Sequence, residues 1–130
     1  MKRIVYIVSG SLVTLFILGL IGTYFWIDLS VKRNIGTAKE SYPGTAEDAL
    51  IAYLLDTTNS AQHRSSVAVW TLGQIKSEKA LPILNELYKN DPKGKICSGK
   101  HDSVLCQYQI NKALNAIKSD WELLHSRLNK

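Results

Sequence analysis

TLGQIKSEKALPIL, residues 71–84, has the pattern of a tight turn between two packed helices. Apolar residues recur at helical spacing on both sides of the short polar segment at its centre. Pro82 falls near the start of the second helix, where a missing backbone N–H costs least. Gly73 lowers helix propensity by about 1 kcal/mol relative to alanine, so we expect it to let the next helix pack closely. The stretch therefore predicts an α-helical hairpin.

The same pattern returns about 42 residues further along the chain. LGQIKSEKALPIL (72–84) and LNAIKSDWELLHS (114–126) align without a gap and share Ile-Lys-Ser followed by an acid. Capping boxes at Thr45–Asp48 and Ser119–Glu122 predict two helix starts. We expect an all-α domain of about five helices, over residues 45–55, 63–76, 80–90, 102–118 and 119–129.

VAVWTLGQIKSEKALPILNELYKND, residues 67–91, resembles a HEAT-like repeat of the short bacterial type. In that family a small-residue helix ends in Ala-Leu-Gly-x-Ile, and a tight turn leads to Ala-Leu-Pro-x-Leu and a closing acidic turn. The matching positions here are Thr71, Leu72, Gly73, Ile75, Ala80, Leu81, Pro82, Leu84 and Asp91. The resemblance implies a right-handed stack of antiparallel helix pairs that serves as a binding surface.

The resemblance covers one repeat well, residues 102–129 weakly and residues 46–57 loosely. Thr71 replaces the usual alanine, Arg64 is displaced from the family's Val-Arg position, and Asn115 replaces the glycine of the second repeat. About ten residues that include the two cysteines form an insertion. These departures leave open whether the family's usual Arg–Asp loop contact forms.

An uncharged apolar segment of 24 residues, Ile4–Ile27, precedes the helical domain. As a helix it would extend about 36 Å, enough to cross a hydrocarbon core of about 30 Å. Aromatic side chains near its two ends suit the membrane–water interface; they are Tyr6, Tyr24, Phe25 and Trp26. A cleaved signal peptide is the alternative, but the run exceeds an apolar region of about 7–15 residues and lacks a small-x-small cleavage site.

These signals divide the chain into three parts. We expect a single-pass anchor over residues 1–29 that contacts the lipid bilayer through residues 4–27, a polar linker over 30–44, and the HEAT-like helical domain over 45–130. The formal net charge is +5, and residues 1–42 hold five basic and two acidic side chains. The remaining 88 residues hold 11 basic and 9 acidic side chains, so a nucleic-acid partner is not expected.

The only two cysteines, Cys97 and Cys106, have eight residues between them. An isolated pair that follows a membrane anchor predicts a disulfide in an oxidising compartment. A loop this short would gain about 2–3 kcal/mol from the bond. The pairing would place the helical domain outside the cytoplasm, on the periplasmic side of the inner membrane. Two alternatives remain open: free thiols, or a metal site in which His101 is the third ligand and the fourth is unassigned.

No arrangement of nucleophile, acid and base stands out in the sequence, so we expect no catalytic residue, no cofactor and no enzyme activity. The predicted function is a membrane-anchored protein-interaction module, an accessory or scaffold subunit whose partner is another membrane-associated protein. Candidate contacts with that partner or with anionic headgroups are Lys89, Lys93, Lys95 and Lys100. One alternative is a metal-binding or redox sensor or enzyme centred on Cys97, His101 and Cys106. The other is a cytoplasm-facing adaptor with reduced thiols.

Overall fold

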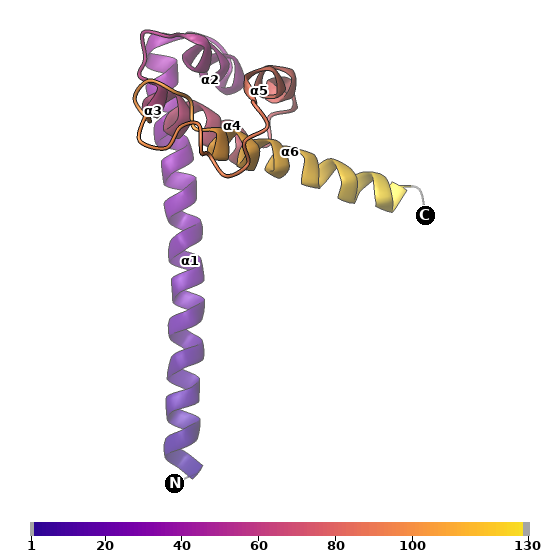
Figure 1. Cartoon of the computed structure of the whole chain (residues 1–130). Coiled ribbons are helices and arrows are strands. Elements are labelled where there is room, and N and C mark those ends of the chain that lie inside the picture. Colours follow the sequence, from indigo (N-terminus) through magenta and orange to yellow (C-terminus); the bar gives the residue numbers. More distant parts are fainter. Residues whose placement is uncertain (1, 129–130) are drawn as a thin grey trace. The chain divides into compact units, whose positions relative to one another are not determined.

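The computed structural model describes the backbone of residues 2–128 and the side chains of residues 10–119. The all-α prediction is confirmed, since no strand occurs among residues 2–128. The helices are α1 (Lys2–Ser41), α2 (Ala46–Leu55), α3 (Ala61–His63), α4 (Trp70–Gln74), α5 (Leu81–Leu87) and α6 (Gln107–Leu128) (Figure 1). A π-helical turn, Arg64–Val69, joins α3 to α4, and a 3₁₀ turn, Glu78–Ala80, precedes α5. The chain divides into two compact units, Met1–Lys32 and Arg33–Lys130.

The first unit consists of helix with an exposed apolar surface. α1 is the one helix in the described part of the chain that is long and apolar enough to cross a membrane. Leu12, Phe16 and Leu20 are each more than half exposed, at 64%, 68% and 52%. Contact of such a surface with water costs roughly 25 cal/mol per Å², so it requires an apolar environment.

Two threonine hydroxyls in this part of α1 form hydrogen bonds within the helix. The Thr14 hydroxyl donates to the Gly10 carbonyl at 2.9 Å, and the Thr23 hydroxyl donates to the Leu20 carbonyl at 2.8 Å. Local bonds of this kind suit a lipid environment, which offers side chains no other hydrogen-bond partner. The aromatic residues Tyr24, Phe25 and Trp26 are highly exposed at the end of the apolar surface. The side chain of Tyr6 lies outside the described residues.

The predicted linker over residues 30–44 is wrong for most of its length, because α1 continues to Ser41. Ala38 is fully buried, and the Asn34 side-chain amide donates to the Thr71 hydroxyl at 2.9 Å. Ile35, Ala38 and Tyr42 recur at helical spacing and contact the core of the second unit. Because most residues of the segment are polar, its sequence did not predict this apolar face. The boundary between the units therefore falls after Lys32 and not at residue 44.

The core of the second unit lies between α2, α4, α5 and α6. α6 packs against α4 and α5, while α2 packs against the π-helical turn. Fully buried leucine and isoleucine side chains fill the space between them; these are Leu50, Leu54, Leu72, Leu84 and Ile110. Deleting any one of these side chains back to alanine would cost about 2–5 kcal/mol, because a cavity would remain.

The turn after α4 contains a backbone motif that could not be predicted from the residue types. Lys76 adopts a left-handed conformation with φ of 54°. Its N–H donates to the Gly73 carbonyl at 3.3 Å, and the Ser77 N–H donates to the Leu72 carbonyl at 3.1 Å. This pair of bonds is a Schellman motif, which usually places glycine at the left-handed position. It ends the first helix of the hairpin, and Pro82 then lies in the first turn of α5, as predicted.

The predicted cap of α2 is confirmed. The Thr45 hydroxyl oxygen accepts from the Asp48 N–H at 3.2 Å. Lys79 forms an ion pair with Asp48, and this contact joins the start of α2 to the 3₁₀ turn. The hydrogen bond from Lys79, with a further one from Thr45, holds the pKa of the Asp48 carboxyl below its usual range.

Two other sequence expectations differ from the structure. α6 runs through the predicted start of a fifth helix, and the Ser119 hydroxyl donates to the Ala116 carbonyl at 3.1 Å instead of capping. No glycine or proline interrupts Gln107–Leu128, so the helix has no reason to end there. Gly73 does allow close packing, but its neighbour is Ala113 of α6 and not the following helix.

The packing at Gly73 yields a prediction. A Cβ atom at this position would lie 2.9 Å from Ala113 Cα and 3.0 Å from Ala113 Cβ. We expect Gly73→Ala to lower the free energy of unfolding by about 1–3 kcal/mol, because the backbone of α6 would have to shift. Gly36→Ala is the matched control, since a Cβ there meets nothing within 4 Å.

The control should leave stability unchanged or raise it by up to about 1 kcal/mol through helix propensity. Thermal unfolding of both full-length variants in mild detergent, followed by circular dichroism, measures the difference. Equal stability of the two variants would contradict the close α4–α6 contact.

Candidate functional site

A long irregular loop, residues 88–106, separates α5 from α6. It contains turns but no helix or strand. Loops longer than about 12–15 residues without secondary structure are uncommon in compact domains and usually carry function or are disordered. This loop contains both cysteines and His101, so it is the strongest candidate for a functional site.

A carboxylate organises the first part of the loop. Asp91 Oδ2 accepts from the Ile96 N–H at 2.7 Å, and the Asp91 carbonyl accepts from the Gly94 N–H at 3.1 Å. The hydrogen bond from the Ile96 N–H holds the pKa of the Asp91 carboxyl below its usual range. Gly94 has φ of 65°, and a Cβ there would lie 3.1 Å from Tyr108 Cβ and 3.3 Å from Cys97 Sγ. Glycine therefore lets the loop fold tightly around Cys97.

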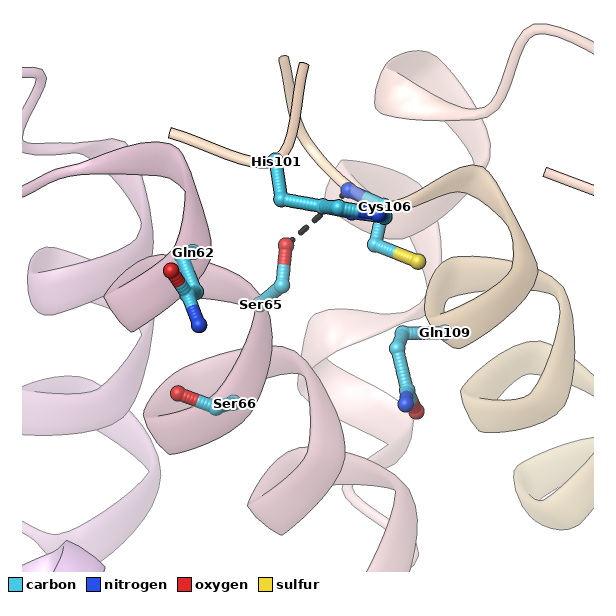
Figure 2. Close-up of a pocket in the computed structure, with 6 residues that line it drawn as sticks. All are labelled: Gln62, Ser65, Ser66, His101, Cys106 and Gln109. Atoms are coloured by element: carbon cyan, nitrogen blue, oxygen red, sulfur yellow. Dashed lines mark hydrogen bonds between the residues drawn. The ribbon is translucent and has the colours of Figure 1, made fainter. Parts of the chain in front are cut away.

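Polar contacts fasten the second part of the loop to the helices. The Ala61 N–H, at the start of α3, donates to the Asp102 carbonyl at 3.1 Å. The Cys106 N–H donates to the hydroxyl of the buried Ser65 at 3.0 Å (Figure 2). Gln107, which is also buried, accepts from the Lys89 N–H at 2.7 Å and donates to the Leu87 carbonyl at 3.3 Å. Both ends of the loop are thus held close together.

These contacts bring Cys97, His101 and Cys106 together. The two sulfur atoms and a ring nitrogen of His101 all lie within 4.8 Å of one another. Cys97 is buried and its thiol donates to the Gly94 carbonyl at 3.2 Å, while His101 is exposed and Cys106 is partly buried. Burial raises the pKa of the Cys106 thiol. Both cysteines are free thiols here, so the disulfide stays a prediction.

Two hollows border this Cys–His–Cys cluster. The first has a volume of about 260 Å³ and is lined by Gln62, Ser65, Ser66, His101, Cys106 and Gln109 (Figure 2). The second has a volume of about 360 Å³, and its lining includes both cysteines, His101, Lys93 and Lys95. His101 and Cys106 line both hollows, so the cluster borders open space.

The structure places the four candidate lysines on or beside this loop. Lys89, Lys93, Lys95 and Lys100 are all exposed. Within the described part of the chain none of their ammonium groups forms an ion pair. Lys93 and Lys95 line the hollow that contains the cysteines, whereas Lys89 lines a separate hollow near Glu86. The lysines therefore do not all line one hollow, and Lys100 lines neither of these two.

Sequence reasoning missed the polar residues that line the first hollow. Gln62, Ser65 and Ser66 lie in the helical segment 61–69, and Gln109 lies in the first turn of α6. Residues of these types are common on helix surfaces, so nothing in the sequence singled them out. Only the packing of the loop against the helices places them beside His101 and Cys106.

The role of Asp91 can be tested by Asp91→Asn. We expect the Ile96 amide to exchange its hydrogen several-fold faster, because a hydrogen bond to a neutral side chain is weaker than one to a carboxylate. Asp102→Asn is the control, since the side chain of Asp102 is exposed. Hydrogen exchange, corrected for intrinsic rates, is the measurement; equal protection in both variants would contradict the proposed role.

The same contact predicts a pH dependence of the loop. The pKa of Asp91 is lowered in the folded chain from its ordinary value of 3.8, so folding favours the ionised form. Its stabilising effect is complete above that ordinary value and is lost as the pH falls through the lower, folded-state pKa. Protection of the Ile96 amide should therefore decline below about pH 4 in the unmodified chain. The Asp91→Asn variant should show no such decline.

Comparison of the chain with protein-family models, with curated proteins and with solved structures gives no match. The HEAT-like resemblance therefore stays a prediction.

Proposed function

We propose that this chain is a single-pass inner-membrane protein whose helical domain binds another protein. It would act as a non-catalytic accessory or scaffold subunit of a membrane complex. The observation that carries the proposal is the exposed apolar surface of α1, joined in one chain to a small folded helical unit. A surface of this kind suits lipid, and it would confine the helical unit to the membrane surface.

The loop 88–106 supplies the proposed contact surface. Its lysine ammonium groups are exposed and form no ion pair among the described residues, so an acidic surface on a partner could contact them without breaking existing pairs. By contrast, Lys79 is paired with Asp48 and Lys32 with Asp28. Steering by such unpaired charges accelerates association and weakens with added salt.

Orientation in the membrane is part of the proposal. We place the helical domain outside the cytoplasm, because an isolated cysteine pair can form a stable disulfide in that oxidising environment. Support comes from the Cys97 and Cys106 sulfur atoms, which lie within 4.8 Å of each other, so that a modest local adjustment would join them. The positive-inside rule does not favour either orientation, because basic residues lie on both sides of the apolar segment. A reporter enzyme fused at each end of the chain measures the orientation directly.

Membrane anchoring can be tested at the centre of the apolar segment. We expect the double change Leu15→Arg and Leu18→Arg to abolish resistance to alkaline extraction. Each arginine at the centre of a spanning helix costs about 2.5–3.5 kcal/mol on insertion scales. The control is Leu15→Phe with Leu18→Phe, which keeps the surface apolar and should stay in the membrane fraction. Retention of the arginine variant in that fraction would argue against a bilayer anchor.

Partner binding can be tested by neutralising the loop. We expect a variant with Lys89, Lys93, Lys95 and Lys100 all changed to glutamine to lose a specific crosslinked partner that the unmodified chain captures in intact membranes. Lys39→Gln with Lys118→Gln is the control, because both lysines are exposed on helices away from the loop sequence.

The readout is the amount of each crosslinked species at low and at raised salt. A partner that both variants capture equally would remove the loop from the interface. Failure to capture any partner under any growth condition would count against an interaction module.

A further inference from the structure

Three side chains with metal-binding chemistry meet in the loop 88–106, and the proposed protein partner makes no use of them. We propose that Cys97, His101 and Cys106 bind one zinc ion, whose fourth coordination position is reached through the hollow that all three residues line. The inference does not rest on the proposed protein partner. It concerns the reduced form of the cysteine pair, which the structure contains, because sulfur atoms joined in a disulfide cannot bind zinc as thiolates.

The geometry is close to what zinc requires. Zinc–sulfur bonds of about 2.3 Å and zinc–nitrogen bonds of about 2.0 Å in a tetrahedron give distances of roughly 3.5–3.8 Å between ligand atoms. The three ligand atoms here lie within 4.8 Å of one another. Inward shifts of about 1 Å complete the arrangement. His101 is exposed and can rotate, while Cys97 is already fixed by burial.

His101 distinguishes a metal site from a disulfide. A disulfide needs only the two sulfur atoms and gains nothing from an imidazole near both of them. Here the fold of the loop sets a histidine within reach of each sulfur. Two thiolates with one imidazole form a ligand set of the type that zinc prefers over magnesium or calcium.

The middle of the loop gains little stability from apolar burial. Ile96 is 44% exposed and Cys97 is the one fully buried apolar residue there, whereas Tyr88 and Leu105, which pack against the core, lie at the two ends of the loop. Most of the remaining order comes from hydrogen bonds between turns. A small domain commonly gains stability from a metal that joins distant ligands, so a bound ion would fasten the middle of the loop to the start of α6.

The fourth position and the charge fit an exchangeable ion. Among the described residues the group holds three ligands and no fourth, so water or an incoming ligand would complete the tetrahedron from the 360 Å³ hollow. Sites with three protein ligands and one open position are typical of zinc that binds a further ligand. Two thiolates neutralise the ion, so Lys93 and Lys95 nearby do not oppose its binding.

The test uses tag-free, full-length protein in mild detergent, stripped with a chelator under reducing conditions. We expect one Zn²⁺ per chain by elemental analysis after reloading. Co²⁺ should give the visible bands of tetrahedral cobalt and a sulfur-to-cobalt charge-transfer band. His101→Gln should weaken Zn²⁺ binding at least ten-fold and abolish the tetrahedral cobalt spectrum. Because His101 is exposed, this variant should keep its helical content.

His63→Gln is the matched control, since His63 is also an exposed histidine but lies at the end of α3. It should bind zinc as the unmodified chain does. Substoichiometric zinc in the reduced protein, or binding that His101→Gln leaves unchanged, would overturn the site. Isolation of the native protein with Cys97 joined to Cys106 and no zinc uptake after reduction would also overturn it.

Discussion

The contact between Gly73 of α4 and Ala113 of α6 is the constraint on which the helical unit depends. The two backbones approach so closely that a methyl group at Gly73 would lie 2.9 Å from the Ala113 backbone. This contact sets the position of α6, and α6 in turn carries Ile110, Leu114 and Ile117 into the shared core. α2, α4 and α5 are short, with 10, 5 and 7 residues, so their stability comes from this packing more than from propensity.

The position of α6 also determines the site. Its first residue, Gln107, is bonded to the Leu87 carbonyl and the Lys89 N–H, which close the loop 88–106 at its base. The preceding Cys106 is bonded to Ser65 in the π-helical turn. A π-helical turn is uncommon and is often found at functional sites. The cluster of Cys97, His101 and Cys106 is therefore built on the same contacts that hold the core together.

α1 and the loop 88–106 require different surroundings. α1 needs an apolar environment along residues 10–27, where its side chains are exposed and its threonines bond to their own helix. The loop is polar, with exposed lysines and a partly accessible pair of thiols. A membrane surface satisfies both requirements, because it combines a hydrocarbon interior with an aqueous, charged boundary.

Much of the fold could be predicted from sequence periodicity. The apolar segment, the cap at Thr45, the position of Pro82 and the all-α class follow from local patterns, because each depends on residues within a few turns of one another. The candidate ligands Cys97, His101 and Cys106 were also visible as a short motif. Their convergence was not, since it depends on how Asp91, Gly94 and Ser65 hold the loop.

The two copies of Ile-Lys-Ser show that the same local sequence can end one helix and continue another, depending on tertiary packing. Side-chain spacing predicts the long apolar segment and the amphipathic helices, because it sets which face of a helix is apolar. It could not determine where those helices end. Lys76 adopts a left-handed conformation and ends a helix, whereas Lys118, in the identical tripeptide, continues one. After Lys76 the chain must turn so that Leu81 and Leu84 can reach the core, and that burial offsets the strain at Lys76.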